Sequence, residues 1–526
     1  MRSEVVLLRP AGERTRAAAS RPATEAYYVA FESLGLGYVG AYLRSKGVSV
    51  ELMDGTIDPW SRQEMVDRVL AADPLLVGFS LLWEGYPDTR EVVRCLREAG
   101  WTGHVTMGQH FATFNHERLL EDFTDLDSVV RFEGEQTSWE LVQALRRGDT
   151  TFGDIAGLSW RGPEGVVANP VRPLLEDLDS LPFPARDVMA RNPEKLDWVT
   201  ISGSRGCPWR CRYCSISTFY RIPEGKIFRH RSPKNLVDEI EAIGRTFGKN
   251  SFSFTDDQFM GGGKRGRRFV EGFADEVLSR GLDIRFSIEN RADTLNKPIF
   301  RKLHRAGLER VFMGIESGYQ PTLDYYRKDI TVEQNLRAIR TLEELGIGVS
   351  MGFILFNPRT DPAEIRANLS FLREARQVGP EVFFQDLSIW GGTAMMDEHG
   401  SGQDLSDMYT VEYTITDPTA ARFRDHMRSL LKILAVPWAQ TQKLRALGME
   451  EILCKRFENS LREASLDLGE VVLARLEADS LDDNALVGLQ QQLENTATQV
   501  QVAIEVASLL TGGPNGQERR HQQSVY

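Results

Sequence analysis

The sequence predicts an α/β protein in which two parallel-sheet units are followed by a helical region. Short apolar runs alternate with amphipathic helical patterns over residues 1–150, and the same alternation resumes at residue 199. Such alternation favours parallel sheets, because a crossover helix joins neighbouring parallel strands. Beyond residue 395 only helical patterns remain. With 526 residues, the chain is also too long for one simple core.

The first unit, residues 1–150, is expected to be a doubly wound, Rossmann-like sheet with helices on both faces. Amphipathic segments at Gly37–Lys46, Arg62–Ala71 and Pro87–Ala99 predict helices between its strands. The candidate strands are Val5–Leu8, Ser49–Met53, Leu75–Ser80, His104–Met107 and Ser128–Arg131.

The carboxyl ends of these strands are where a ligand of such a sheet binds. They carry Asp54-Gly55-Thr56, Ser80-Leu81-Leu82, Gly108-Gln109-His110 and Glu133-Gly134-Glu135. Three of the four contain glycine, which lets a ligand approach the backbone closely. No G-x-G-x-x-G motif follows the first strand, so a dinucleotide site is not indicated. The alternative is that this N-terminal unit binds no ligand or binds a nucleotide.

A linker strap is expected over residues 151–198. The runs Gly157–Gly162 and Gly165–Val167 predict a small hairpin. The segment Leu178–Arg186 contains two prolines, which disfavour a helix, so it is expected to be extended.

The second unit, residues 199–395, is expected to be a partial barrel of six βα units. Helical patterns at Pro233–Thr246, Lys264–Arg280 and Glu333–Leu345 separate the strands. The candidate strands are Trp198–Ser202, Ser251–Thr255, Asp283–Ile288, Arg310–Gly314, Val349–Leu355 and Val382–Ile389. In such barrels the chemistry lies at the carboxyl ends of the strands.

Three of the chain's five cysteines lie in one short loop after the first barrel strand: Cys207, Cys211 and Cys214. The spacing C-x3-C-x2-C supplies three thiolates to one metal centre and no fourth. Structural zinc sites and ordinary electron-transfer clusters take four protein ligands, whereas three thiolates on a [4Fe–4S] cluster leave one iron open. A zinc site whose fourth ligand is Cys95, Cys454 or a histidine is the alternative interpretation.

This loop, with Tyr213 before its last cysteine, closely resembles the site of the radical S-adenosylmethionine (SAM) superfamily. The resemblance implies a [4Fe–4S] cluster whose open iron chelates SAM, and electron transfer that cleaves SAM to a 5′-deoxyadenosyl radical. It also implies polar SAM contacts at successive strand ends. Gly314-Ile315-Glu316-Ser317 matches the family's G-I-E-S segment, and Gly352–Pro358 resembles its adenine-binding segment. The candidate SAM-binding residues are Tyr213, Asp256, Asp257, Arg291 and Glu316.

Each of these carboxylates has a simpler interpretation, because an Asp or Glu ahead of a helix stabilises the helix N-terminus. Taken one at a time, helix capping and function are equally plausible. Taken together at consecutive strand ends, they favour a shared site.

The first unit is similar to the cobalamin-binding domain that precedes many radical SAM cores. Ser80-Leu81-Leu82 matches the S-x-L segment of that family, and Gly108 matches the first glycine of its G-G pair. The segment Leu34–Leu43 matches its entry helix. Two features depart from it: Gln109 replaces the second glycine, and no D-x-H-x-x-G loop is present, so the lower face of cobalt lacks the usual histidine. We assign His110 no ligand role, because a lone loop histidine is more often a hydrogen-bonding residue. The candidate cobalamin-binding residues are Asp54, Thr56, Ser80, Leu82, Gly108, Gln109, Glu133 and Gly134.

The last region, residues 396–510, is expected to be a helical domain that covers the barrel mouth, and residues 511–526 a disordered tail. Cys454 is expected to be a buried apolar residue. The helical patterns are Thr419–Leu434, Gln440–Cys454, Lys455–Ala478 and Asn484–Leu510.

Composition limits the partners and the compartment. A formal net charge of -12 argues against nucleic acid, and no apolar run is long enough for a membrane span. Few cysteines and an oxygen-sensitive cluster fit a reducing cytoplasm. An electron donor such as flavodoxin or ferredoxin, and a small-molecule or peptide substrate, are the expected partners.

The resemblance as a whole implies a cobalamin-dependent radical SAM enzyme of the class B methyltransferase type. A methyl group would move from SAM through methylcobalamin to an unactivated carbon. The alternatives are a rearrangement or cyclisation without methyl transfer, a radical SAM enzyme with a vestigial first domain, and a cobalamin-binding sensor or carrier.

Overall fold

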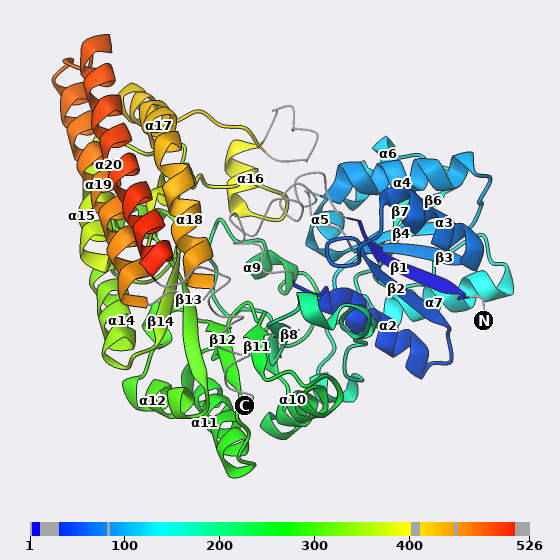
Figure 1. Ribbon diagram of the computed structural model, residues 1–526. Helices are drawn as coiled ribbons and strands as arrows, with labels where there is room; N and C mark the ends of the chain where they lie inside the picture. The colour runs from blue at the N-terminus through cyan, green and yellow to red at the C-terminus, as the bar shows by residue number, and fades with distance from the viewer. Residues whose placement is uncertain (1–2, 11–30, 81–84, 401–410, 447–450, 511–526) are drawn as a thin grey trace.

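The computed structural model of this chain describes residues 3–10, 31–80, 85–400, 411–446 and 451–510. Two sheets built mainly of parallel strands stand side by side, and long helices flank the second sheet on the side away from the first (Figure 1). This arrangement confirms the predicted fold class of a Rossmann-like unit, a partial barrel and a helical unit. The predicted disordered tail, residues 511–526, lies outside the described residues.

The N-terminal sheet has seven strands in the order β2-β1-β3-β4-β5-β6-β7, and the first five in this order are parallel. Val5, Val6 and Leu8 are fully buried, as expected where helices cover both faces. All five predicted strands are present: β1 Val5–Arg9, β2 Val50–Asp54, β3 Leu76–Ser80, β4 His104–Gly108 and β5 Ser128–Val130. The covering helices are α2 Leu34–Ser45, α3 Arg62–Ala72, α4 Tyr86–Glu98, α5 Gln109–Phe114, α6 His116–Asp122 and α7 Glu135–Arg147.

The predicted hairpin forms, as β6 (Leu158–Gly162) and β7 (Gly165–Ala168), and it extends the N-terminal sheet. Strand β6 pairs antiparallel with β5, and Trp160 is buried in the core of this unit. The strap that follows carries only short elements: η3 Leu178–Ser180, α8 Asp187–Arg191 and η4 Pro193–Lys195.

A buried arginine of this strap connects the two sheet units. Arg186 forms ion pairs with Glu32, just ahead of α2, and with Glu239 of the barrel, each at 2.8 Å. All three side chains are at most 8% exposed. Breaking one partner of a buried pair leaves an uncompensated charge, so this contact fixes how the units meet.

The barrel sheet has five strands in the order β14-β13-β12-β11-β8, all parallel. Its strands are β8 Val199–Ile201, β11 Ser251–Phe254, β12 Arg285–Glu289, β13 Leu308–Glu316 and β14 Gly348–Phe353. A small antiparallel pair, β9 Ser204–Arg205 with β10 Arg229–His230, lies beside it. The helices of this unit are α9 Ile216–Phe219, α10 Pro233–Phe247, α11 Gly263–Ser279, α12 Lys297–Arg305, α13 Gln320–Tyr325, α14 Val332–Glu344 and α15 Pro362–Ala375, with η5 at Ala292–Thr294.

The predicted sixth strand, Val382–Ile389, is reduced to one parallel bridge between Phe356 and Asp386. Residues Pro380–Phe384 form a short 3-10 helix, η6, instead. The apolar run resembled a strand, but Gly379 and Pro380 start a turn, and Phe383 is buried against Phe423 of the helical unit.

The helical unit consists of α16 Ala394–His399, α17 Pro418–Leu431, α18 Ala435–Ala446, α19 Glu451–Glu477 and α20 Asp483–Leu510, with η7 at Lys432–Leu434. Asp417 caps α17, and Pro418 is its first residue. The predicted boundary after Cys454 is wrong, because Cys454 lies inside α19. It is fully buried, as predicted.

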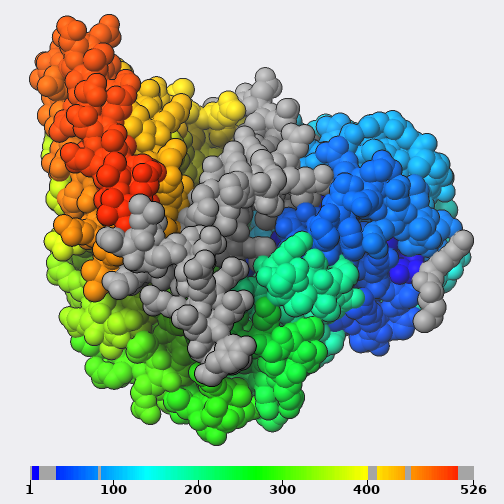
Figure 2. Space-filling view, in the orientation of Figure 1, coloured from blue at the N-terminus to red at the C-terminus, as the bar shows by residue number. Residues whose placement is uncertain are grey.

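The helical unit and the N-terminal unit lie at opposite sides of the molecule (Figure 2). Helix α19 packs along α15, and Arg373 of α15 forms an ion pair with Asp467 of α19 at 2.8 Å. None of the helices in the described ranges is long and apolar enough to cross a membrane.

Candidate functional site

The cysteine loop begins just after β9, and its entry is fixed by one glycine. Gly206 has φ +93°, and a Cβ atom there would lie 1.9 Å from the carbonyl oxygen of Ile227. Only glycine fits this turn. Cys211 is buried, while Cys207 and Cys214 are partly exposed.

A positive charge lies beside the buried thiol of Cys211. Nη1 of Arg291 lies 3.7 Å from Sγ of Cys211, and its guanidinium lies 4.6 Å from the ring centre of Trp209. Burial raises the pKa of Cys207 to about 11 and that of Cys214 to about 12, so both thiols hold their protons until a metal displaces them. In the described part of the chain, no three Cys, His, Asp or Glu side chains could hold a single metal ion. The spacing of the three cysteines is thus the observation that favours a [4Fe–4S] cluster, and Arg291 places a positive charge beside it.

Glu316, at the carboxyl end of β13, is held by two neighbours. Nζ of Lys328 donates to its Oε1 at 2.7 Å, and the Tyr213 hydroxyl donates to the same atom at 2.8 Å. Lys328 also donates to the Tyr213 oxygen at 3.0 Å. Glu316 has φ +68°, which is strained for a residue with a side chain. The structure thus brings the predicted residues Tyr213 and Glu316 together, beside the cysteine loop.

Lys328 was missed by sequence reasoning. It lies outside the strand ends, between α13 and α14, and reaches Glu316 from twelve residues further along the chain. Its side chain is only 5% exposed. A lysine in a loop carries no sequence signal of burial, so only the fold reveals it.

The two predicted aspartates have different surroundings. Asp256 is buried and accepts hydrogen bonds from the Gly203 amide at 3.0 Å and from the Ser204 hydroxyl. Burial raises its pKa to about 7, although these hydrogen bonds oppose the shift. Its carboxyl group is turned into the protein, so its position gives no support to the predicted SAM contact. Asp257 accepts from the Gly206 amide at 3.2 Å, and burial raises its pKa to about 6.

Glu289 is the last residue of β12, and Arg291 lies two residues beyond it. Desolvation, and then the negative charges of Asp257 and Asp256, raise the pKa of Glu289, although part of this residue is exposed. The guanidinium of Arg291 is paired with Asp293 at 2.9 Å and also donates to the carbonyl oxygen of Lys328. Arg291 lies beside the cysteine loop, and its contact with SAM stays a prediction.

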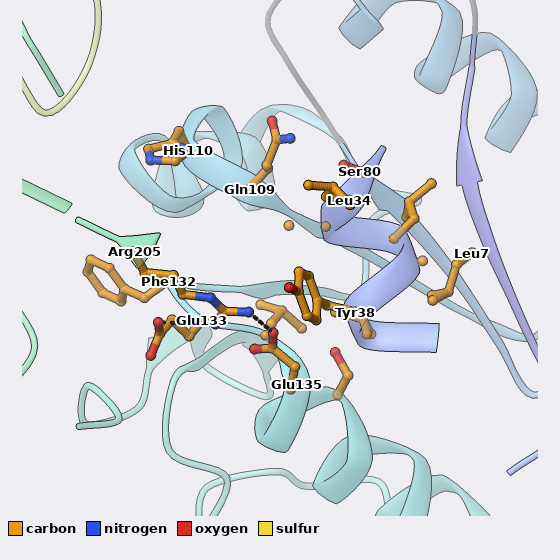
Figure 3. A pocket seen from close by; sticks show the side chains of 18 of the residues that line it. Leu7, Leu34, Tyr38, Ser80, Gln109, His110, Phe132, Glu133, Glu135 and Arg205 are labelled. Atoms are coloured by element: carbon orange, nitrogen blue, oxygen red, sulfur yellow. Dashed lines mark hydrogen bonds and ion pairs between the residues drawn. The ribbon is translucent and has the colours of Figure 1, made fainter. Parts of the chain in front are cut away.

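A cavity of about 300 Å³ lies between the two sheets (Figure 3). It extends from Leu7 and Gly78 in the N-terminal sheet to Thr255 and Asp257 at the end of β11. Its walls are mostly apolar or uncharged, and at Gly35 of α2 a Cβ atom would meet nothing within 4 Å. The cavity thus opens at the carboxyl ends of strands in both sheets.

Five of the eight predicted cobalamin-binding residues line this cavity: Ser80, Gly108, Gln109, Glu133 and Gly134. Asp54 and Thr56 do not line it, so the cavity gives no support to their predicted role. Asp54 forms an ion pair with Arg9 at 2.6 Å and accepts from the Thr56 amide at 3.1 Å, so it closes the ends of β1 and β2. Leu82 lies outside the described residues. Gln109 Oε1 and His110 Nε2 on this wall have no hydrogen-bond partner within the described ranges, which fits a bound group that supplies one.

An ion-pair network joins the cavity to the cysteine loop. Arg205, two residues before Cys207, pairs with Glu133 at 3.1 Å and with Glu135 at 2.5 Å. Arg229 pairs with Glu133 at 3.0 Å. Although burial opposes it, these two arginines hold the pKa of Glu133 below its usual value. Sequence reasoning found Glu133 but not its partners, since they lie 72 and 96 residues further along the chain.

Comparisons with known proteins agree with this arrangement. Residues 201–372 match the model of the Radical SAM superfamily, and residues 22–142 match that of the B12 binding domain. An uncharacterised methyltransferase of Pyrococcus horikoshii is 28% identical over 73% of this chain and 82% of its own length. The anaerobic magnesium-protoporphyrin IX monomethyl ester cyclase of Rubrivivax gelatinosus is 28% identical over 61% of this chain, and the match spans only 58% of that cyclase.

The fold also matches a solved structure. The cobalamin-dependent S-adenosylmethionine radical enzyme OxsB, with aqua-cobalamin bound, aligns with a TM-score of 0.75 over 96% of this chain and 79% of its own. Sequence identity in that alignment is 18%, so this likeness concerns the fold.

Proposed function

We propose that this chain, which belongs to the radical SAM superfamily and carries an N-terminal B12 binding domain, is a methyltransferase that acts on an unactivated carbon. One observation carries the proposal. The cavity lined by Ser80, Gly108 and Gln109 reaches the barrel strand ends at Thr255 and Asp257. A cobalamin held there would lie between its own domain and the barrel.

The chain uses a [4Fe–4S] cluster, SAM and cobalamin. When bound, the cluster and SAM supply hydrogen-atom abstraction, and cobalamin supplies a carrier for a methyl group. Cys207, Cys211 and Cys214 would hold the cluster. Arg291 would stabilise the negative charge at Cys211.

The remaining residues position these groups. Glu316, fixed by Lys328 and Tyr213, would present a carboxylate for a polar contact with SAM at the end of β13. Asp257 would face the cavity close to the cysteine loop. The ion pairs of Arg205 with Glu133 and Glu135 would hold the cobalamin site and the cluster site at a fixed distance and orientation. A low-potential electron donor such as flavodoxin or ferredoxin would serve the cluster, and the substrate would be a small molecule or a peptide.

An anaerobic assay tests the proposal. The protein is reconstituted with iron, sulfide and cobalamin, supplied with SAM and a reductant, and its products are quantified. We expect both S-adenosylhomocysteine and 5′-deoxyadenosine from the wild type. If S-adenosylhomocysteine were absent whether or not cobalamin is present, methyl transfer would be excluded.

A second candidate is a rearrangement or cyclisation without methyl transfer, since a cyclase is among the similar proteins. In the same assay, this candidate predicts 5′-deoxyadenosine alone. The production of 5′-deoxyadenosine should still depend on cobalamin and on the intact cysteine loop.

A further inference from the structure

Two neighbouring side chains on the cavity wall have buried polar atoms that nothing in the described chain satisfies. They are Gln109 and His110, the first two residues of α5 (Figure 3). Oε1 of Gln109 and Nε2 of His110 have no hydrogen-bond partner among the described residues. An unsatisfied buried polar atom costs about 1–3 kcal/mol, and such atoms are rare in folded proteins. Two of them on one wall indicate that a ligand supplies the missing partners.

The backbone at this point is held in an unusual conformation. Gln109 has φ +80°, in the left-handed region that a residue with a side chain rarely adopts. This local strain is explained if the glutamine amide contacts a ligand.

The chemistry of the two atoms restricts the ligand. The Oε1 atom of glutamine only accepts hydrogen bonds, so the ligand must offer an N–H or O–H group. Burial lowers the pKa of His110 to about 4, so its ring is neutral at physiological pH. Arg205, a cation that also lines the cavity, is already paired with Glu133 and Glu135. This wall is thus suited to amide or hydroxyl groups and not to a phosphate.

The position of His110 within the cavity follows from its contact with the barrel unit. Its ring lies 4.1 Å from that of Phe219, centre to centre. Phe219 belongs to α9, the helix that follows Cys214. His110 is therefore on the barrel side of the cavity, whereas Leu7 and Gly78 line its other end. For methyl transfer, cobalt has to face the barrel, so the corrin ring belongs near His110 and the nucleotide tail deeper in the N-terminal sheet.

We propose that Gln109 and His110 hydrogen-bond the amide side chains on the corrin edge of cobalamin that faces the barrel. This rests on the proposed function in two respects: cobalamin occupies the cavity, and methyl transfer turns its corrin ring toward the barrel. His110 is a binding residue in this account and does not ligate cobalt.

Binding titrations without SAM, reductant or substrate test the proposal separately from methyl transfer. The whole protein is titrated with cobalamin and with cobinamide, which keeps the corrin amides but lacks the nucleotide. In His110→Phe, affinity for both should fall by the same factor, about 3- to 10-fold for one lost hydrogen bond. His110→Gln, which can still form a hydrogen bond, should lose less. His116→Phe is the matched control, because His116 contacts Ser159 and is outside the cavity lining.

Stability of the cobalamin-free protein provides a second readout. Since Nε2 of His110 has no partner there, His110→Phe should unfold at the same denaturant concentration as the wild type or higher. A lower midpoint together with unchanged affinity would mean a merely structural histidine and would overturn the proposal. Loss of affinity for cobalamin but not for cobinamide would place His110 at the nucleotide tail and overturn it as well. A nitrogen splitting in the electron paramagnetic resonance spectrum of bound cob(II)alamin, lost in His110→Phe, would show cobalt ligation and overturn it too.

These outcomes separate the inference from the proposed function. If the wild type binds cobalamin tightly and His110→Phe does so equally, only the inference fails. If the wild type binds no cobalamin, both fail.

Discussion

The two parallel sheets of this protein use their strand ends in opposite ways. At the N-terminal sheet, the ends of β3 and β4 carry Ser80 and Gly108 and border an open cavity with mostly uncharged walls. At the barrel, the ends of β11, β12 and β13 carry Asp256, Arg291 and Glu316, and each is already engaged with a neighbouring group. The first arrangement suits a large group held by shape, and the second a charged group held by fixed polar contacts.

This difference explains which residues could be predicted. The cysteine loop and the strand ends follow from local sequence, because spacing and alternation are local properties. The lysine that holds Glu316 does not, since Lys328 reaches it from a loop with no periodic signal. The ion pair of Asp54 with Arg9 could not be predicted, because a strand-end carboxylate that faces a ligand and one that pairs with an arginine look alike in sequence. The sixth strand was overpredicted because an apolar run at 382–384 forms a 3-10 turn.

The largest effect is expected from Cys211→Ala on the barrel side. Loss of a cluster ligand should reduce 5′-deoxyadenosine formation by about 100-fold or more, since even residues that only support metal ligands cost 10–100-fold. Chromatographic quantification of 5′-deoxyadenosine after anaerobic reconstitution measures this. Cys95→Ala, a cysteine on α4, is the control and should keep wild-type activity. Full activity in Cys211→Ala would refute the cluster assignment.

Lys328→Met tests whether the barrel site is held by buried charge. Removing the lysine leaves Glu316 buried without its cation, which should lower the free energy of unfolding by about 3–5 kcal/mol. Denaturant titration measures the change. Lys302→Met is the control: its partner Asp275 has a side chain 66% exposed, so about 0–1 kcal/mol is expected. A loss below about 1 kcal/mol in Lys328→Met would show that the pair is solvated. The double variant with Glu316→Gln should recover part of the loss.

Asp256→Asn tests the pH dependence that the barrel side predicts. The pKa of Asp256 is raised to about 7 in the folded protein, so the folded state keeps a proton that the unfolded state releases. Stability should therefore fall as pH rises from about 4 to about 7, by up to roughly 1.4 kcal/mol per pH unit. Asparagine cannot titrate, so the variant should show a flatter profile in denaturant titrations. Asp154→Asn, an exposed aspartate, should leave the slope unchanged. An equal slope in Asp256→Asn and wild type would mean that Asp256 titrates normally.

Gly35→Leu tests the N-terminal side, where space and not charge is expected to matter. The new side chain would project into open space at the cavity wall. It should lower cobalamin affinity about 10- to 100-fold, equivalent to roughly 1.4–2.8 kcal/mol, while the cobalamin-free protein stays as stable as the wild type. Absorbance titration measures the affinity. Gly153→Leu, at an exposed glycine that also has nothing within 4 Å, is the matched control. Unchanged affinity in Gly35→Leu would place cobalamin elsewhere.

The comparison of the two sheets is tested most directly by measuring cobalamin binding and 5′-deoxyadenosine formation together in Cys211→Ala and Gly35→Leu. If the strand ends hold separate cofactors, Cys211→Ala should bind cobalamin like the wild type but form no 5′-deoxyadenosine. Gly35→Leu should bind cobalamin about 10- to 100-fold more weakly but still cleave SAM when reduced. If either substitution removed both properties while the protein stayed folded, the two sites would not be separate and the account would be contradicted.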